Sequence, residues 1–435
     1  MGQPLDGPAH MTYEPTLDYA RGRDAADPLR GYRQRFAMPA DARGRELVYL
    51  CGHSLGLMPL AARDAVIEEL EDWARLAVRG HEGSRRPWIP YHQNLAPGLA
   101  YLTGAAVSEV IAMNSLTANL HFMLASFYRP AGRRVKILIE AGAFSSDRHA
   151  MASQLEWHGV DAQTGLIELG PHPSQDLLTT EAIEACLEQV GDEIALVLWP
   201  GVQFRTGQSF DLARIARAAR RAGCIVGFDL AHSIGNTPLA LHDADADFAI
   251  WCGYKYLNGG PGAIGGCFIH QRHSQRTPRL SGWWGHELAT RFQMEPGFRA
   301  EAGAAGWAVS NPPILSAAPL LASLAIFREA GFERLREKSL ALTGFLEFLL
   351  ERLEPEVRII SPRDAAARGC QLSMRIAGTA ARGKRVFDSL SERGVVCDWR
   401  EPNIIRAAPV PSYNTFADVF TFAAELRRVL GAIQA

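Results

Sequence analysis

The chain has 435 residues, of which 47% are hydrophobic and 21% are charged, and its formal net charge is −2. This length and composition suit a globular protein with a large domain and a smaller one, with enough apolar residues for a sizeable core. The small negative charge argues against a general binder of nucleic acid or of an anionic membrane surface.

Seven cysteines are scattered along the chain, and none has the paired spacing of a zinc site. An odd number of such thiols is typical of a reducing compartment. No basic-then-apolar signal pattern opens the sequence, and no apolar run approaches the length of a membrane span. We therefore expect a cytoplasmic protein that binds no membrane and no metal.

The N-terminal part predicts an arm followed by a helix. The polar segment up to about Glu46 is expected to form the arm with one short helix, and residues 47–50 a short strand. Pro59 is expected to open the next helix, because a proline at that position loses no hydrogen bond, and Gly80 is expected to end it. The apolar stripe of this helix, which we expect to be buried, consists of Ala62, Val66, Leu70, Trp73 and Ala77.

The segment HEGSRRPW, residues 81–88, reads as a solvated connection. A short strand is then predicted at residues 110–113, followed by a helix whose N-cap candidates are Asn114, Ser115 and Thr117. A helix that begins directly after a strand exposes N–H groups that can bind a phosphate. Ordinary capping explains the same residues, so both interpretations stay open.

Strands and helices alternate in the middle of the chain, which is typical of a doubly wound parallel sheet. Strands are expected at residues 135–139, 193–199 and 224–228, and Asp211 is expected to cap the helix before the last of them.

Polar and aromatic side chains follow two of these strands. Phe144 and Asp147 lie just beyond the first strand, and Asp229 ends the third. Open parallel sheets bind ligands at the carboxyl ends of their strands, and an aromatic side chain there can face a planar ring.

The run Phe248–Trp251 has the length of a buried strand, and Tyr254, Lys255 and a glycine-rich turn follow it. A lysine at the end of a buried strand is unfavourable unless it is paired, neutral or used covalently. It could reach the surface along its apolar stem, or it could be a Schiff-base lysine that condenses with a cofactor aldehyde. Asp229 favours the second interpretation, because a carboxylate at that edge can keep a pyridinium nitrogen protonated. The order strand–Asp, strand–Lys is typical of fold-type-I enzymes that use pyridoxal phosphate.

The C-terminal part predicts a long helical region and a compact α+β domain. Within it, Arg406 lies inside the apolar run IIRAAP. This arginine is either half of a buried ion pair or the receptor of a substrate carboxylate, and the residues leave both open. The expected elements are strands at 265–270, 357–360 and 371–376 and helical regions at 315–353, 384–393 and 415–433.

Ten segments in order, from about residue 45 to the C-terminus, resemble the kynureninase family. They are HSLGL, GHEGSRRPW, MNSLTANLH, FSSD, TGQSFDL, GFDLAHSIGN, WCGYKYLNGGPG, GWWGHE, SNPP and IRAAPVPSYN. The resemblance implies a hydrolase that depends on pyridoxal 5'-phosphate and cleaves the β–γ carbon bond of L-kynurenine or L-3-hydroxykynurenine in tryptophan catabolism. The products are anthranilate or 3-hydroxyanthranilate and L-alanine.

The resemblance also implies an architecture. We expect an α/β fold of type I with a mostly parallel central sheet flanked by helices, a smaller α+β domain, and a homodimer with shared active sites. The expected divisions are an N-terminal arm that packs with the small domain (1–60), the large cofactor-binding domain (61–312), and the linker helix with the small domain (313–435).

Site residues are carried over by position. Lys255 matches the lysine that binds the cofactor, and Asp229 matches the partner of the pyridine nitrogen. Tyr254 matches a tyrosine at the phosphate; it is also our candidate proton shuttle, and the two roles stay open. The other expected cofactor contacts are Leu116 and Thr117 at the phosphate, Phe144 (stacking on the ring) and Asp147 of the FPSD-type loop, His232 beside the ring, Trp283 from the partner subunit, and Asn311.

Four positions match substrate contacts of the family. Arg406 matches the receptor of the α-carboxylate, and His81, Trp283 and Asn311 match positions at the aryl ring. Members with these three residue types tend to prefer 3-hydroxykynurenine, since a buried ring hydroxyl needs a polar partner. The resemblance therefore predicts that preference here.

Three residues depart from the family pattern. His53 stands where an asparagine is usual, and Pro200 stands where a residue with a hydroxyl is frequent. Ser145 replaces the proline of the FPSD loop and should loosen it slightly.

Three other functions are compatible with parts of this pattern. A cysteine desulfurase or selenocysteine lyase shares the Asp-then-Lys plan, but it needs a nucleophilic cysteine on a mobile loop, whereas Cys370 and Cys397 have strand-like surroundings. An aminotransferase would need a second amino acceptor. A catalytically silent ligand-binding protein would not need Lys255, Asp229 and Arg406 together.

Overall fold

The computed structural model describes residues 12–275 and 278–433, and these form two compact units. The larger unit comprises residues 55–204, 208–275 and 278–329; the smaller one comprises residues 12–54, 205–207 and 330–433. Each unit contains its own sheet and its own hydrophobic core, and each is described separately below.

The larger unit is built on a seven-stranded sheet in the order β2-β8-β7-β6-β5-β3-β4. Strands β4, β3, β5, β6 and β7 pair in parallel, whereas β8 is antiparallel to both of its neighbours. The predicted mostly parallel sheet is therefore confirmed. The strands are β2 (Val110–Ala112), β3 (Lys136–Glu140), β4 (Leu166–Leu169), β5 (Ile194–Pro200), β6 (Ile225–Asp229), β7 (Phe248–Trp251) and β8 (Gly266–Ile269).

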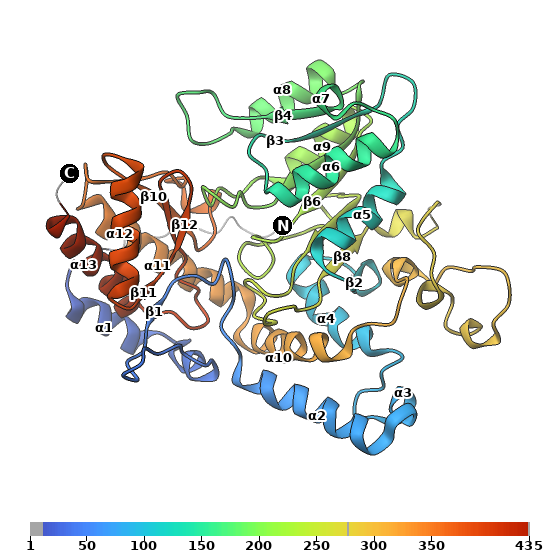
Figure 1. Cartoon of the computed structure of the whole chain (residues 1–435), viewed down its shortest axis with the longest axis horizontal. Coiled ribbons are helices and arrows are strands. Elements are labelled where there is room, and N and C mark those ends of the chain that lie inside the picture. The colour runs from blue at the N-terminus through green and yellow to red at the C-terminus, as the bar shows by residue number, and fades with distance from the viewer. Residues whose placement is uncertain (1–11, 276–277, 434–435) are drawn as a thin grey trace. The chain divides into compact units, whose positions relative to one another are not determined.

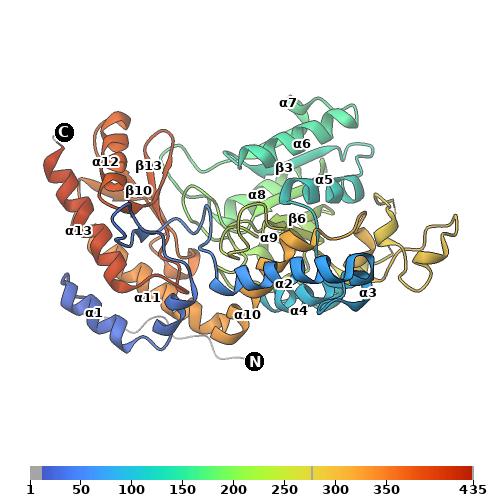
Figure 2. The same cartoon turned by 60° about the horizontal axis from the view of Figure 1, so that its bottom comes forward.

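Helices flank both faces of this sheet (Figures 1 and 2). Side chains alternate between the faces along each strand, so Ile137 and Ile139 share one core with helices α5 and α6. Asp211 caps α9 as predicted, accepting a hydrogen bond from the Arg214 N–H. The helices are α2 (Leu60–Leu76), α3 (Gly80–Gly83), α4 (Tyr91–Thr103), α5 (Leu116–Phe127), α6 (Ser145–Trp157), α7 (Ala162–Gly165), α8 (Thr180–Val190), α9 (Leu212–Arg221) and most of α10 (Ile314–Ala330).

Helix α2 buries a different face from the one that we predicted. Leu70 and Trp73 are 41% and 58% exposed, and Ala77 is also exposed, whereas Glu69 and Asp72 are buried. The stripe prediction is therefore wrong for these three apolar residues. The helix also ends at Leu76, before Gly80.

The buried charges of α2 explain this inversion. Glu69 accepts hydrogen bonds from Arg86 Nε (2.7 Å), Trp88 Nε1 (3.0 Å) and the Tyr91 hydroxyl (3.0 Å). A buried carboxylate with this many donors is compensated for its lost hydration. The predicted solvated connection at residues 81–88 is found in part: Glu82, Gly83 and Arg85 are exposed, whereas Arg86 and Trp88 supply two of the donors.

The smaller unit contains an antiparallel sheet in the order β12-β13-β10-β9 and a parallel pair, β1-β11. Helices α11, α12 and α13 contribute to one core with Leu372, Met374, Ile405 and Ala407. Since side chains alternate, Arg406 points to the other face of the sheet. The elements are α1 (Leu17–Ala26), β1 (Val48–Tyr49), α11 (Phe332–Glu351), β9 (Val357–Ile359), β10 (Leu372–Ile376), α12 (Ala380–Glu392), β11 (Val395–Val396), β12 (Asp398–Arg400), β13 (Ile404–Ala407) and α13 (Phe416–Ala432).

Among the described helices, no single one is both long and apolar enough to cross a membrane. The adjacent helices α10 and α11 meet the criterion of length and composition only when they are taken together.

Candidate active site

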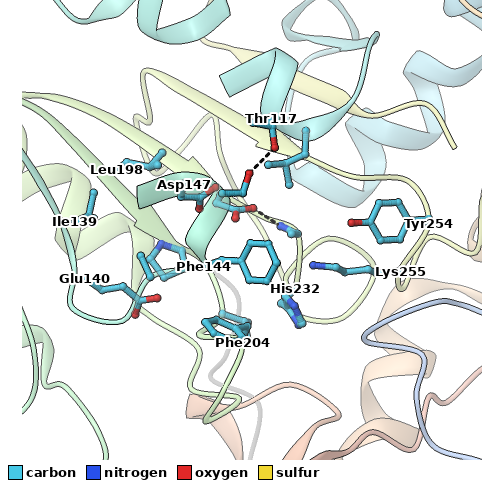
Figure 3. A pocket seen from close by; sticks show the side chains of 17 residues that line it. Thr117, Ile139, Glu140, Phe144, Asp147, Leu198, Phe204, His232, Tyr254 and Lys255 are labelled. Atoms are coloured by element: carbon cyan, nitrogen blue, oxygen red, sulfur yellow. Dashed lines mark hydrogen bonds between the residues drawn. The ribbon is translucent and has the colours of Figure 1, made fainter. Parts of the chain in front are cut away.

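A cavity lies at the carboxyl ends of β3, β5 and β6 in the larger unit (Figure 3). This is the edge at which parallel sheets bind ligands. Eight of the residues selected from the sequence line this cavity: Leu116, Thr117, Phe144, Asp147, Asp229, His232, Tyr254 and Lys255.

The Lys255 side chain extends into this cavity (Figure 3). Its Nζ lies 5.8 Å from the centroid of the Phe144 ring and 5.9 Å from that of Tyr254. Lys255 follows β7 by a few residues and Asp229 ends β6, and these two strands are parallel neighbours. The amine and the carboxylate therefore reach the same cavity from adjacent strands.

Two aspartates face each other in the cavity. The Ala231 N–H donates to Asp229 Oδ1 at 2.7 Å. Asp147 is 6% exposed, and its Oδ1 has no hydrogen-bond partner among the described residues. Burial and the neighbouring Asp229 raise the pKa of Asp147 well above its ordinary value. A buried acceptor of this kind indicates room for a donor that the protein itself does not supply.

Glu140 is a cavity residue that the sequence analysis missed. It ends β3, is 5% exposed, and accepts a long hydrogen bond from Gln203 Nε2 at 3.5 Å. Burial, together with Asp229, raises the pKa of Glu140 to about 8. The signal was present in the sequence, because a carboxylate at the end of an apolar run is also what singled out Asp229.

Two helix N-termini also border the cavity. Leu116 and Thr117 belong to the first turn of α5, and Ser146 belongs to that of α6. Neither helix has a capping hydrogen bond from its N-cap side chain. The Thr117 and Ser146 hydroxyls are 2.6 Å apart and link the two turns (Figure 3). N–H groups at a helix start that no N-cap side chain satisfies can bind an anion.

Tyr254 contacts Cys252 at the edge of the cavity. Burial, followed by Cys252 and Asp229, raises the pKa of the Tyr254 hydroxyl above its ordinary value. At neutral pH this hydroxyl therefore keeps its proton and can donate it.

The donor set of this cavity fits pyridoxal phosphate. Lys255 supplies an amine, the starts of α5 and α6 suit a phosphate, and the unpartnered Asp147 Oδ1 with Asp229 suits a protonated ring nitrogen. Pro200, the last residue of β5, also lines the cavity but offers no side-chain donor. Ser145 is the first residue of α6, a position that favours proline, which explains how a proline could stand there in relatives.

His81, Trp283 and Asn311 do not line the cavity around Lys255. They line a second cavity of the larger unit, of about 820 Å³, together with Trp284 and Phe292. The Trp283 indole donates to the Arg291 carbonyl at 3.0 Å, and the residue is 43% exposed. Within one chain, the structure thus groups these three residues with one another.

Arg406 belongs to the smaller unit, where it is fully buried on β13. Its Nε donates to Asp398 Oδ2 at 2.7 Å, so the ion pair that the sequence left open is present. His53, also fully buried, lies beside Cys51 and Asp398, with donor atoms within 4.8 Å of one another.

Comparisons with solved structures show which known proteins share this fold. The chain resembles the cysteine desulfurase CsdA of Escherichia coli with a TM-score of 0.76 and 20% identity, covering 93% of this chain and 99% of that one. It resembles the cystine C–S lyase C-DES, solved with cysteine persulfide, with a TM-score of 0.73 and 19% identity, covering 87% and 97%. At these identities the likeness is one of fold.

Sequence comparisons are more specific. The family described as "Kynureninase C-terminal domain" matches residues 335–426. A kynureninase of Xanthomonas campestris pv. campestris (strain B100) is 54% identical over 411 residues, which cover 94% of this chain and 97% of the relative. A kynureninase of Myxococcus xanthus (strain DK1622) is 52% identical over 417 residues, covering 95% and 97%. The chain belongs to the kynureninase family.

Proposed function

We propose that this protein is a hydrolase that uses pyridoxal 5'-phosphate to cleave the β–γ carbon bond of L-kynurenine and L-3-hydroxykynurenine. The products are L-alanine and anthranilate or 3-hydroxyanthranilate, a step of tryptophan catabolism. The observation that carries the proposal is the convergence of Lys255 and Asp229 on one cavity, from adjacent parallel strands, in a member of this family.

Lys255 is the proposed attachment point and base. When bound, the cofactor supplies an aldehyde that condenses with amines and a ring that accepts the electron pair of a deprotonated α-carbon. The Lys255 amine, directed into the cavity, then removes the α-proton and returns it at a neighbouring carbon.

Asp229 holds a proton at the ring nitrogen in this proposal. Asp147, whose pKa is raised by burial and by Asp229, stays protonated beside it and limits the repulsion between the two carboxyl groups. Tyr254, which lines the cavity beside Lys255 and keeps its hydroxyl proton at neutral pH, is the proposed donor to the β-carbon after bond cleavage. The starts of α5 and α6, with Thr117, bind the phosphate.

We propose a homodimer. Spacings of seven and three residues place Leu60, Ile67, Leu70 and Trp73 on one side of α2, and all four are exposed. An exposed apolar helix face is typical of a protein interface. The second cavity, with Trp283, is the part of the chain that we propose contributes to a shared active site. The seven cysteines are free, which suits the cytoplasm as the proposed location.

Substrate contacts follow from the family match. Arg406 binds the α-carboxylate, and His81 and Asn311 face the aryl ring. A site built for the 3-hydroxyl leaves polar groups unpaired when kynurenine binds, which costs about 1–3 kcal/mol, or about ten- to a hundredfold in kcat/KM. We therefore propose a preference for 3-hydroxykynurenine.

Product analysis tests the function. Purified protein with added pyridoxal phosphate is incubated with each substrate, and alanine and the aryl acid are quantified. Equal amounts of both products are expected; their absence with both substrates would contradict the proposal. The ratio of kcat/KM for the two substrates, in wild type, Asn311→Thr and His81→Trp, tests the preference. If wild type prefers kynurenine, or if a preference for 3-hydroxykynurenine survives both substitutions, His81 and Asn311 do not determine the substrate preference as proposed.

A cysteine desulfurase is the alternative that the fold itself suggests. Cys370 and Cys397 are both buried, and burial raises the pKa of the Cys397 thiol. A buried protonated thiol is a poor nucleophile. We therefore expect no sulfide or persulfide from L-cysteine in the same assay.

A further inference from the structure

Arg406 is held in place by a partner from the neighbouring strand. Strands β12 and β13 are antiparallel, and Asp398 and Arg406 stand directly opposite each other in the register. Their side chains therefore project from the same face of the sheet, the face away from the core with Leu372 and Ile405.

The contact fixes one edge of the guanidinium group. Asp398 Oδ2 lies 2.7 Å from Arg406 Nε and 2.6 Å from Nη2. These two nitrogens form one edge of the planar fork, so a ligand carboxylate bound by two hydrogen bonds would meet the other edge, formed by the two Nη atoms. Holding the Nε edge sets both the plane and the direction of that second edge.

Burial makes this contact strong. The Arg406 side chain is 1% exposed and that of Asp398 is 14% exposed. Hydrogen bonds between charged groups are strengthened where water is excluded, and the partner of a buried arginine restricts its few remaining rotamers. A second arginine, Arg400, contacts the same carboxylate: its Nε is 3.0 Å from Oδ2, and its side chain is 35% exposed.

We propose that Asp398 is a positioning residue for the α-carboxylate receptor: it aims the guanidinium of Arg406 and thereby sets the discrimination between substrates with and without that carboxylate. The inference rests on the proposed function, in which Arg406 binds the carboxylate. Asp398 acts through Arg406 and does not itself contact the substrate.

The test compares L-kynurenine with its α-carboxamide, which lacks the negative charge. For each variant, kcat and KM are measured for both compounds, and the ratio of kcat/KM for acid over amide is the readout. A residue that merely supports folding lowers both values together and leaves this ratio unchanged.

In Asp398→Asn we expect the ratio to fall at least about tenfold, with most of the change in KM for the acid, because a misaimed receptor loses binding to a charged group. Asp398→Glu keeps the charge but moves the carboxylate by one methylene group, and the ratio should fall in this variant also. The matched control is Arg400→Gln, which removes the second, more exposed arginine at the same carboxylate and should leave the ratio within about twofold. Arg406→Gln should abolish the discrimination.

A ratio within about twofold of wild type in Asp398→Asn and Asp398→Glu, while Arg406→Gln loses it, overturns the positioning role and leaves the receptor intact. If Asp398→Asn does not fold, Asp398→Glu decides, since a role in charge compensation alone predicts an unchanged ratio. An unchanged ratio in Arg406→Gln overturns the inference, because it shows that Arg406 does not bind the α-carboxylate. Failure of the proposed function appears separately, as wild-type protein that forms no aryl acid.

Discussion

Replacing Glu140 with glutamine should stabilise the cofactor-free protein relative to wild type, and this difference should grow as the pH rises. Glu140 is buried at the end of β3, and its pKa in the folded protein is about 8, against an ordinary value of 4.5. The folded state therefore binds this proton more tightly than the unfolded state does. The contribution of protonated Glu140 to the free energy of unfolding is fully present below pH 4.5 and is lost as the pH rises through about 8.

The magnitude follows from the two pKa values. At 1.36 kcal/mol for each pKa unit, ionising a group shifted from 4.5 to about 8 costs about 5 kcal/mol in total, of which about 4 kcal/mol falls between pH 5 and 8.5. Glutamine keeps the shape of the side chain and never ionises. The free energy of unfolding of Glu140→Gln should therefore gain about 4 kcal/mol on that of wild type across this range.

Urea unfolding of both proteins at several pH values measures the difference directly. Pyridoxal phosphate must be absent, because a ligand adds its own linkage to stability. Glu193→Gln is the control: Glu193 pairs with Lys136 at 2.6 Å, and that hydrogen bond lowers its pKa, so the contribution of the pair is complete above the ordinary pKa and the difference from wild type should stay constant across this pH range. A difference between wild type and Glu140→Gln that changes by less than about 1 kcal/mol would refute the reasoning.

Three further predictions concern the site and the assembly. Lys255→Ala should abolish turnover, and after treatment with borohydride no cofactor should remain covalently attached to the protein. The circular dichroism spectrum should be unchanged, and normal turnover would exclude Lys255 as the attachment point. Asp229→Asn should lower kcat about a thousandfold or more, because several kcal/mol of charge stabilisation are lost, and a loss of less than about tenfold would mean that the carboxylate acts elsewhere. Light scattering at micromolar concentration should give the mass of two chains for wild type. The double variant Leu70→Glu, Trp73→Glu, which places charges on the exposed apolar side of α2, should favour the monomer. A wild-type monomer with full activity would contradict the shared site.

The sequence predicted the sheet and most of the first cavity because their signals are local. An apolar run with a polar residue at its end marks β6 and β7, and the parallel arrangement brings such ends to one edge. Glu140 ends β3 with the same pattern and was missed because nothing next to it in the sequence distinguishes a buried acid from an exposed one. Its pKa is raised by burial and, to a smaller extent, by Asp229, and both depend on residues far away along the chain.

Arg406 illustrates a second limit. The sequence offered an ion pair or a carboxylate receptor as alternatives, whereas the strand register shows that the ion pair exists. The two roles are compatible, since a guanidinium group has more than one edge for a carboxylate. The partner, Asp398, could not be selected from the sequence because the pairing of β12 with β13 depends on the turn between them.

Helix α2 shows why an amphipathic pattern does not decide which face is buried. Its period identified the helix correctly, but the direction of burial depends on partners outside it: Glu69 finds three donors in residues 86–91, and Asp72 accepts from the Arg85 N–H at 2.8 Å. With both charges satisfied, the polar face can be covered at little cost. The apolar side chains of Leu60, Ile67, Leu70 and Trp73 are then left exposed in the single chain, at a free-energy cost that a second protein surface would remove. The same inversion that made the stripe prediction wrong is therefore the strongest physical argument for the proposed dimer.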